Sequence, residues 1–334
     1  MIDTLLLGAG FLILLTGGEL LVRGAVRVAD HVGMSPLLIG LTLVGFGTSA
    51  PELVTSVQAA MRGSPGIAIG NIVGSNIANI MLILGLSAVI RPMAVGTAAF
   101  QRDGMIVLVS ALLFNAIGLL TPLDRPVGVV LLGLLTAYLW YAYRQEHGRA
   151  HVEGHTAAYE RAAAIETFRP DAGEQKRRRH WPPLRIDVVA ALMTVIVGMA
   201  LVIAGGRLLV DAAVSIARTY QVSEAVIGLT IISIGTSMPE LATSAIAAFR
   251  KQADVALGNI MGSNIYNTLG IGGATGLLSP TVIPDEIVRY DNLVMLGASM
   301  AMLVFARSGY QLSRPEGLVL LAGYGVYLYT LLPK

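Results

Sequence analysis

The sequence predicts an all-α polytopic membrane protein whose ten transmembrane helices form two inverted five-helix repeats. Composition, the spacing of apolar windows and an internal repeat lead to this fold class. Of the 334 residues, 54% are hydrophobic and 13% are charged, and the mean hydropathy is +0.70. This balance is typical of multi-spanning membrane proteins, because a water-soluble core could not bury so much apolar surface.

Ten apolar windows are long enough to cross a bilayer. Their approximate bounds are 4–28, 36–61, 66–90, 104–121, 126–144, 186–212, 222–249, 254–278, 290–306 and 315–333. The first window lacks a basic leader and contains Glu19 and Arg23, so we interpret it as a retained helix and not as a signal peptide. Five windows lie on each side of one long polar loop.

The polar loop at 144–183 divides the chain into a first repeat, 1–143, and a second repeat, 184–334. Its basic run at 176–179 predicts that the loop is cytoplasmic. Because five is odd, the second repeat enters the membrane from the side opposite to the first, and both termini then lie outside. Slightly more arginines of the short loops fall on the predicted inner side than on the outer side, and this bias favours the same orientation.

The internal repeat relates residues 40–79 to residues 228–267 without a gap, and 23 of these 40 positions are identical. Each copy contains a Gly-Thr-Ser-x-Pro-Glu motif and a Gly-Asn-Ile-x-Gly-Ser-Asn-Ile-x-Asn motif. The first motif places Glu52 and Glu240 inside apolar segments. A carboxylate is costly there, so both glutamates are interpreted as functional.

Proline at 51 and 239 removes a backbone donor, which predicts a break in each helix and a freed carbonyl at Gly47 and Gly235. A broken helix is tolerated in hydrocarbon only where it lines a cavity or contacts protein. Hydroxyl groups share a helical face with each glutamate. Such oxygens suit Na⁺, Ca²⁺ or Mg²⁺. The stripe residues are Thr48, Thr55 or Ser56, Thr236, and Thr243 or Ser244.

The second motif adds a polar face to the following helix of each repeat, because its members recur at i, i+4 and i+8. Glu52 and Glu240 would meet near the bilayer midplane and supply a formal charge of −2. That charge balances one divalent cation, and several monovalent cations are the alternative. Pairs such as Gly70 with Gly74 are more typical of helix packing. The face comprises Asn71, Ser75 and Asn79, and then Asn259, Ser263 and Asn267.

Other charged residues receive structural interpretations. Glu19 with Arg23, and Arg207 with Asp211, stand four residues apart, so each pair is predicted to meet on its own helix. The histidines at 147, 151 and 155 have metal-clip spacing. Glycines at 148 and 154 weaken a helix there, which favours a solvated loop. With no cysteine, thiolate chemistry is excluded. No cofactor, nucleic acid or protein partner is expected, only membrane lipid and transported ions.

At the two motif pairs the chain resembles the prokaryotic calcium/sodium antiporters of the cation/calcium exchanger superfamily. The resemblance implies Na⁺/Ca²⁺ exchange by alternating access, with the first and sixth helices sliding, in a bacterial or archaeal inner or plasma membrane. Many members have aspartate where this chain has Asn267, which leaves stoichiometry, potassium dependence and electrogenicity open. The implied ligands are Thr48, Ser49, Glu52, Ser75, Asn79, Thr236, Ser237, Glu240, Ser263 and Asn267, with backbone carbonyls at Gly45 and Ser233.

Three other functions remain as alternatives. A proton/calcium antiporter is the nearest, since both glutamates could carry protons. A passive cation channel would use the same oxygens without coupling two ions. An intramembrane enzyme is disfavoured, because all five histidines lie in predicted loops or at helix ends and no Ser–His or paired Asp site is evident.

Overall fold

The computed structural model describes residues 2–32, 49–95, 97–147, 184–307 and 311–332. Almost all of this described part is helical, as the sequence predicts. The first half contains α1 (Ile2–Val32), α4 (Ala50–Met61), α5 (Pro65–Ile77), the π-helical η2 (Ala78–Leu84), α6 (Gly85–Ile90), α7 (Thr97–Leu120) and α8 (Arg125–His147).

The second half follows a similar order, with two further π-helical segments among the described residues. It contains α10 (Leu184–Tyr220), α11 (Glu224–Ile227), the π-helical η3 (Gly228–Ile232), α12 (Ser233–Thr236), α13 (Met238–Phe249), α14 (Ala253–Ile265), the π-helical η4 (Tyr266–Ile271), α15 (Gly272–Leu278), the π-helical η5 (Ile287–Asp291), α16 (Asn292–Arg307) and α17 (Arg314–Leu331).

Six helical segments of the described chain are long and apolar enough to cross a membrane, and a bent seventh segment joins them if α11 to α13 count as one span. The predicted windows at 254–278 and 315–333 are helical but fall short of this criterion. The window at 36–61 lies partly outside the described residues. The count of ten spans therefore stays a prediction. The six segments are Ile2–Ala25, Pro65–Ile90, Arg102–Leu120, Arg125–Gln145, Val188–Tyr220 and Ile287–Arg307.

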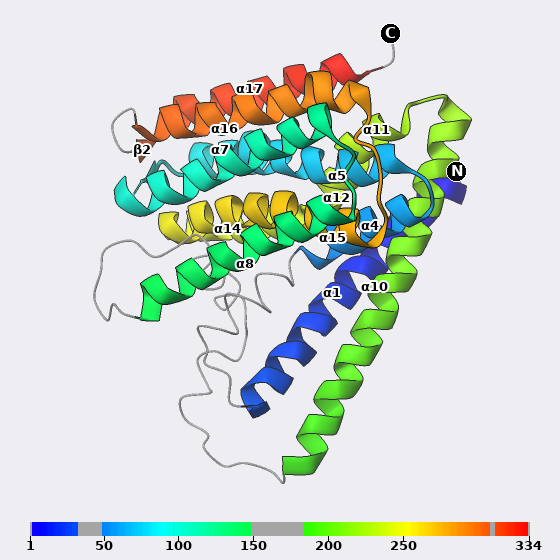
Figure 1. Ribbon diagram of the computed structural model, residues 1–334. Coiled ribbons are helices and arrows are strands. Elements are labelled where there is room, and N and C mark those ends of the chain that lie inside the picture. The colour runs from blue at the N-terminus through cyan, green and yellow to red at the C-terminus, as the bar shows by residue number, and fades with distance from the viewer. Residues whose placement is uncertain (1, 33–48, 96, 148–183, 308–310, 333–334) are drawn as a thin grey trace.

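The two longest helices, α1 and α10, lie side by side along one edge of the molecule (Figure 1). Glycines allow their backbones to come close. A Cβ atom added to Gly17 would lie 2.6 Å from the backbone nitrogen of Val202, and one added to Gly205 would lie 2.6 Å from that of Leu14. Small residues at helix crossings are a standard device of membrane proteins. The pair therefore packs as a unit against the remaining helices.

Equivalent glycines also allow α8 and α17 to pack closely on the rest of the bundle. Gly128 of α8 packs against the backbone of Gly273 and Gly276 in α15, and Gly317 of α17 packs against Gly85 and Ala88 in α6. Both contacts follow an Arg-Pro-x-Gly sequence, at 125–128 and at 314–317. The two halves thus place α8 and α17 in equivalent positions.

Two short backbone contacts were not predicted. Strand β1 (Met93–Ala94) pairs antiparallel with β2 (Gln311–Leu312), and a single bridge joins Leu123 to Thr281. Two-residue strands between helices leave little hydrophobic pattern from which to predict them.

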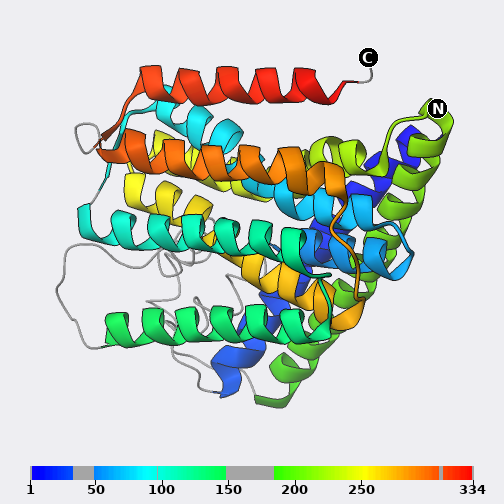
Figure 2. The same ribbon diagram turned by 45° about the horizontal axis from the view of Figure 1, so that its top comes forward.

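In Figure 2 the first residues of α1 and the last residues of α17 lie toward one side of the molecule, and the C-terminal end of α8 lies toward the other.

One of the two predicted ion pairs is present and the other is wrong. Arg23 pairs with Glu19 on α1. Asp211 of α10 instead pairs with Arg62, at the end of α4, and Arg62 also donates to the carbonyl of Arg207 at 3.3 Å. A partner on a neighbouring helix therefore replaces the predicted one on the same helix. The histidine prediction lies almost wholly outside the described residues, which include His147 but not the other two positions.

Candidate ion-binding site

The helix that carries Glu240 is broken where the sequence predicts. The helical segment Glu224–Thr236 and α13 differ in direction by 49°, with Ser237 at the junction and Pro239 in the first turn of α13. Ser49 stands at the matched junction, with φ −88° and ψ 8°, against −84° and 9° at Ser237. In each half a helix therefore begins two residues before the glutamate, at Ala50 in α4 and at Met238 in α13. Gly47, on the other side of the first junction, lies outside the described residues.

Both glutamates are buried in the first turn of a helix. Glu52 in α4 and Glu240 in α13 are each 1% exposed. The positive end of a helix dipole favours negative charge in this turn, which lowers the cost of burying a carboxylate. A buried charge remains costly unless it is paired, so each carboxylate favours binding of a cation beside it.

One asparagine braces each glutamate helix. The Nδ2 of Asn71 donates to the carbonyl of Glu52 at 3.1 Å and to Oγ of Ser56 at 2.9 Å. The Nδ2 of Asn259 likewise donates to the carbonyl of Glu240 at 3.4 Å, and to Oγ of Ser244 at 2.9 Å. Since both Nδ2 groups donate to the glutamate helices, Asn71 and Asn259 position those helices in this arrangement.

Hydrogen bonds join the two halves at the site. Ser237 donates from Oγ to Oε1 of Glu52 at 3.2 Å, and Thr236 donates from Oγ1 to Oδ1 of Asn71 at 3.1 Å. Ser75 donates from Oγ to the carbonyl of Ser233 at 3.5 Å. Residues far apart in sequence therefore share one buried network.

Close packing of α5 on η3 makes this network possible. A Cβ atom added to Gly74 would lie 2.6 Å from the carbonyl oxygen of Leu229 and 2.8 Å from Oγ of Ser233. Gly70 is similarly close to the carbonyl of Ala225. The packing interpretation of these glycines is therefore confirmed.

Several buried oxygens of the site have no hydrogen-bond partner in the described part of the chain. Leaving such an atom without any partner costs about 1–3 kcal/mol. A cation coordinated by these atoms would remove that cost, and neutral amide and hydroxyl oxygens are normal Ca²⁺ and Na⁺ ligands. The atoms are Oδ1 of Asn79, Oδ1 of Asn259, Oγ of Ser263 and Oδ1 of Asn267.

Two further asparagines, Asn76 and Asn264, support Asn79, and they were not predicted from the sequence. Asn79 donates from Nδ2 to Oδ1 of Asn264 at 3.0 Å, so its own Oδ1 is left as the group available to an ion. Asn264 donates to the carbonyl of Asn76 at 3.5 Å, and Asn76 donates to Thr268 at 3.1 Å. The Gly-Ser-Asn motif contained the signal, because Asn76 and Asn264 are its third residues.

The helices that carry Asn79 and Asn267 are not regular α-helices. Segments η2 and η4 begin at Ala78 and Tyr266, which are equivalent in the repeat. A π-helical turn widens the helix and rotates later side chains, and such turns concentrate at functional sites. The i, i+4, i+8 spacing predicted a shared face, and the structure adds a change of helix type at the third member.

The predicted ligands are distributed as follows. Ten of the twelve lie in the described chain, and Gly45 and Thr48 lie outside it. No group of three or more His, Asp or Glu side chains in the described residues could hold a metal, so any cation here would depend on neutral oxygens as well as carboxylates. The ten described residues are all buried: Ser49, Glu52, Ser75, Asn79, Ser233, Thr236, Ser237, Glu240, Ser263 and Asn267.

Comparison with known proteins places this chain in a family. Residues 2–144 and 190–332 match the family model of the sodium/calcium exchanger protein. The sodium/calcium exchanger MaX1 of Methanosarcina acetivorans is 30% identical over 344 residues, covering 99% of this chain and 98% of that protein. The inner membrane protein YrbG of Escherichia coli is 35% identical over 336 residues, covering 99% and 97%.

Solved structures agree. A structure of the sodium-calcium exchanger NCX_Mj soaked with 2.5 mM Na⁺ and 0.1 mM Ca²⁺ superposes with a TM-score of 0.62 at 30% identity, covering 100% of this chain and 99% of that one. A second, soaked with 100 mM Na⁺ and 10 mM Sr²⁺, gives a TM-score of 0.60. The chain is therefore an integral membrane protein of the sodium/calcium exchanger family, a family of transporters and not of enzymes.

Proposed function

We propose that this protein is a secondary active antiporter that exchanges Na⁺ for Ca²⁺ across the membrane by alternating access. One observation carries the proposal: two glutamates from equivalent positions are buried, and the helices that carry them, α4 and α13, pack against η4 and η2, where amide oxygens have no hydrogen-bond partner among the described residues. The relatives are in keeping with it, since one is named a sodium/calcium exchanger and NCX_Mj crystals were soaked with Na⁺ and Ca²⁺.

The proposed ligands divide into charged and neutral groups. Glu52 and Glu240 supply a formal charge of −2, which balances one Ca²⁺ or two Na⁺ ions. Hydroxyl and amide oxygens complete the coordination, as hard cations require. Because both ions use the same kind of oxygen, binding of one displaces the other. With alternating access, this competition results in exchange of the two ions across the membrane. The neutral ligands are Gly45, Thr48, Ser49, Ser75, Asn79, Ser233, Thr236, Ser237, Ser263 and Asn267, those at Gly45 and Ser233 through their carbonyls.

We also propose ten spans in two inverted repeats, 1–143 and 184–334, joined by a cytoplasmic loop at 144–183. Each short contact between connections fits this topology. The β1–β2 pair joins two connections assigned to the inside. The Leu123–Thr281 bridge and the bond from Ser64 to Glu224 join connections assigned to the outside. A parallel arrangement would separate the members of each pair by the width of the membrane.

The α1–α10 pair is the proposed moving element. Its two helices pack closely on each other at glycines, while α10 contacts α4 mainly through apolar side chains, with a few polar contacts among the described residues. Gln58 donates to the carbonyl of Ile203 at 2.9 Å, and Arg62 pairs with Asp211. Surface ion pairs of this kind contribute only about 0–1 kcal/mol. A mostly apolar contact with few directional bonds among the described residues is compatible with sliding and with alternating access.

We place the protein in the cell membrane of a prokaryote with both termini outside, in keeping with the named inner membrane relative from Escherichia coli. The deciding experiment is uptake of ⁴⁵Ca²⁺ by proteoliposomes loaded with Na⁺ and diluted into Na⁺-free buffer. Uptake that requires the outward Na⁺ gradient supports the proposal. Uptake driven only by a pH gradient would replace it with proton/calcium exchange. Flux without a counter-ion requirement would point to a channel. K⁺-loaded vesicles are the control, and the proposed Na⁺/Ca²⁺ exchange predicts no uptake into them.

A further inference from the structure

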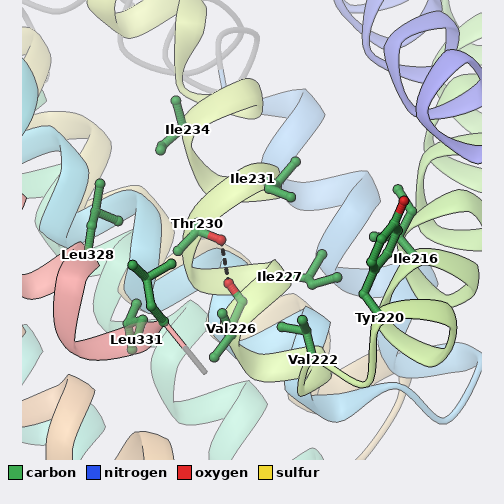
Figure 3. A pocket seen from close by; sticks show the side chains of 11 residues that line it. Ile216, Tyr220, Val222, Val226, Ile227, Thr230, Ile231, Ile234, Leu328 and Leu331 are labelled. Carbon is green, nitrogen blue, oxygen red and sulfur yellow. Dashed lines mark hydrogen bonds between the residues drawn. The ribbon is translucent and has the colours of Figure 1, made fainter. Parts of the chain in front are cut away.

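A groove of about 480 Å³ lies between the end of α10, segments α11 and η3, and the end of α17 (Figure 3). This volume falls in the range of ordinary small-molecule sites, about 300–1,000 Å³. The lining is aliphatic apart from one threonine and one tyrosine. Representative members are Ile216, Val226, Ile231, Leu328 and Leu331.

The two polar residues of the groove do not call for a polar ligand. Thr230 donates its hydroxyl to the carbonyl of Val226 at 2.6 Å, which Figure 3 draws as a dashed line. Tyr220 is 67% exposed at the rim. Water inside the groove would find no free partner, and a site of this kind favours an apolar occupant.

The groove is continuous with the surface that this integral membrane protein presents to lipid. Ile231 is 42% exposed and Leu332 is 59% exposed. The groove also lies where helices end, since α10 ends at Tyr220 and α17 at Leu331. Tyrosines are enriched at this level of a membrane, between headgroups and hydrocarbon. A chain entering past Tyr220 would pass from the headgroup region into hydrocarbon.

We propose that this groove binds one acyl chain of a membrane phospholipid. Lipid is the occupant that surrounds the groove, and an unbranched chain matches its aliphatic lining. The chain would lie against η3, whose other face packs on α5 through Gly70 and Gly74. Directly after η3 comes Ser233, whose carbonyl accepts from Ser75 in the ion site. A bound acyl chain would therefore brace η3 from the side opposite to the ion site.

The test uses the full-length protein in vesicles of phosphatidylethanolamine and phosphatidylglycerol, with a trace of phosphatidylglycerol carrying a photoreactive diazirine near one acyl terminus. After illumination, labelled peptides are mapped by mass spectrometry. We expect label on residues 216–234 and 328–332, and loss of this label in Leu328→Trp and in Leu331→Trp, which fill the groove. The matched control Leu318→Trp changes a residue of the same helix that is 56% exposed and lies outside the groove, and it should retain the label.

Label spread evenly over the exposed apolar surface would overturn the proposal, as would label that survives both groove-filling variants. Absence of label from the groove of the unsubstituted protein, together with a stable dimer in a native gel, would assign the groove to a second copy of the chain instead. None of these outcomes depends on transport, so failure of the acyl-chain site is distinguishable from failure of the proposed exchange.

Coupling to transport rests on the proposed function. We expect Na⁺-driven ⁴⁵Ca²⁺ uptake to be slower in Leu328→Trp than in Leu318→Trp at equal amounts of folded protein. Equal rates in the two variants would contradict bracing of η3 by the acyl chain.

Discussion

Ser237 donates a hydrogen bond from its hydroxyl to Oε1 of Glu52 at 3.2 Å, so a hydroxyl of the second repeat positions a carboxylate of the first. Thr236 makes a comparable link to Asn71 at 3.1 Å. None of these four residues lies on α1 or α10, so sliding of that pair would leave the link between the halves in place. The two halves therefore meet at the point where the ions are proposed to bind.

Replacement of either glutamate by glutamine should abolish exchange. Glu52→Gln or Glu240→Gln leaves one carboxylate, which no longer balances a divalent cation in a buried site. Glutamine has nearly the same shape, so the protein should stay folded. The measurement is Na⁺-driven ⁴⁵Ca²⁺ uptake, with thermal unfolding as the folding check. Glu224→Gln is the matched control, because Glu224 pairs with Ser64 away from the site. Full exchange in both site variants would reject the assignment.

Loss of either bracing asparagine should weaken ion binding without eliminating it. Asn71→Ala removes two hydrogen bonds that hold the Glu52 helix, and Asn259→Ala removes the equivalent pair at Glu240. Replacement of a residue that orients a metal ligand typically lowers metal affinity by about 10–100-fold. We expect the Ca²⁺ KM to rise by about this factor, while the maximal rate changes less. An unchanged KM in both variants would show that the glutamate helices need no brace.

Asn267→Asp should change the ion balance of the site. The aspartate adds a third carboxylate next to Ser263, and both residues are buried. We expect a lower Ca²⁺ KM and a steeper dependence of uptake on internal Na⁺, because more positive charge is needed to neutralise the site. Asn267→Ala removes the amide oxygen without adding charge, so it should instead raise the Ca²⁺ KM. Identical behaviour of the two variants would contradict an electrostatic role for this position.

The repeat made much of the site predictable from the sequence. Two copies of one motif, each with a proline beside a glutamate, are enough to predict a broken helix, and the 49° bend at Ser237 agrees. The periodicity of Asn71 and Ser75 also predicts a common face, which the structure shows as buried. These features depend on local backbone chemistry, which sequence patterns record directly.

Features that depend on tertiary contacts were not predicted. Asp211 pairs with Arg62 across helices, because long side chains at a helix crossing choose between local and distant partners. The π-helical segments η2 and η4 leave no mark in hydrophobic periodicity, since the wider turn spans only seven and six residues, too few to change the pattern. The support of Asn79 by Asn264 requires knowledge that the third helix of each repeat crosses the other. These contacts become visible only once the halves are assembled.

Close packing of α1 on α10 should make one glycine indispensable. A Cβ atom added to Gly205 would lie 2.6 Å from the backbone nitrogen of Leu14 and 2.9 Å from its Cα. Backbone atoms cannot move aside as a flexible side chain can, so Gly205→Ala must push the helices apart. Such overpacking costs about 1–3 kcal/mol, and the midpoint of thermal unfolding should fall.

Gly8→Ala is the control for this prediction, because Gly8 lies in α1 but a Cβ atom there would have no atom within 4 Å. Alanine also favours helix over glycine, so this variant should be as stable as the parent or slightly more so. If α1 and α10 move as a unit, Gly205→Ala should also slow exchange at saturating Ca²⁺ while the Ca²⁺ KM stays nearly unchanged, since neither residue touches the ion site. Equal stability and equal rates in the two variants would mean that the pair tolerates separation, and sliding as a unit would then lose its structural basis.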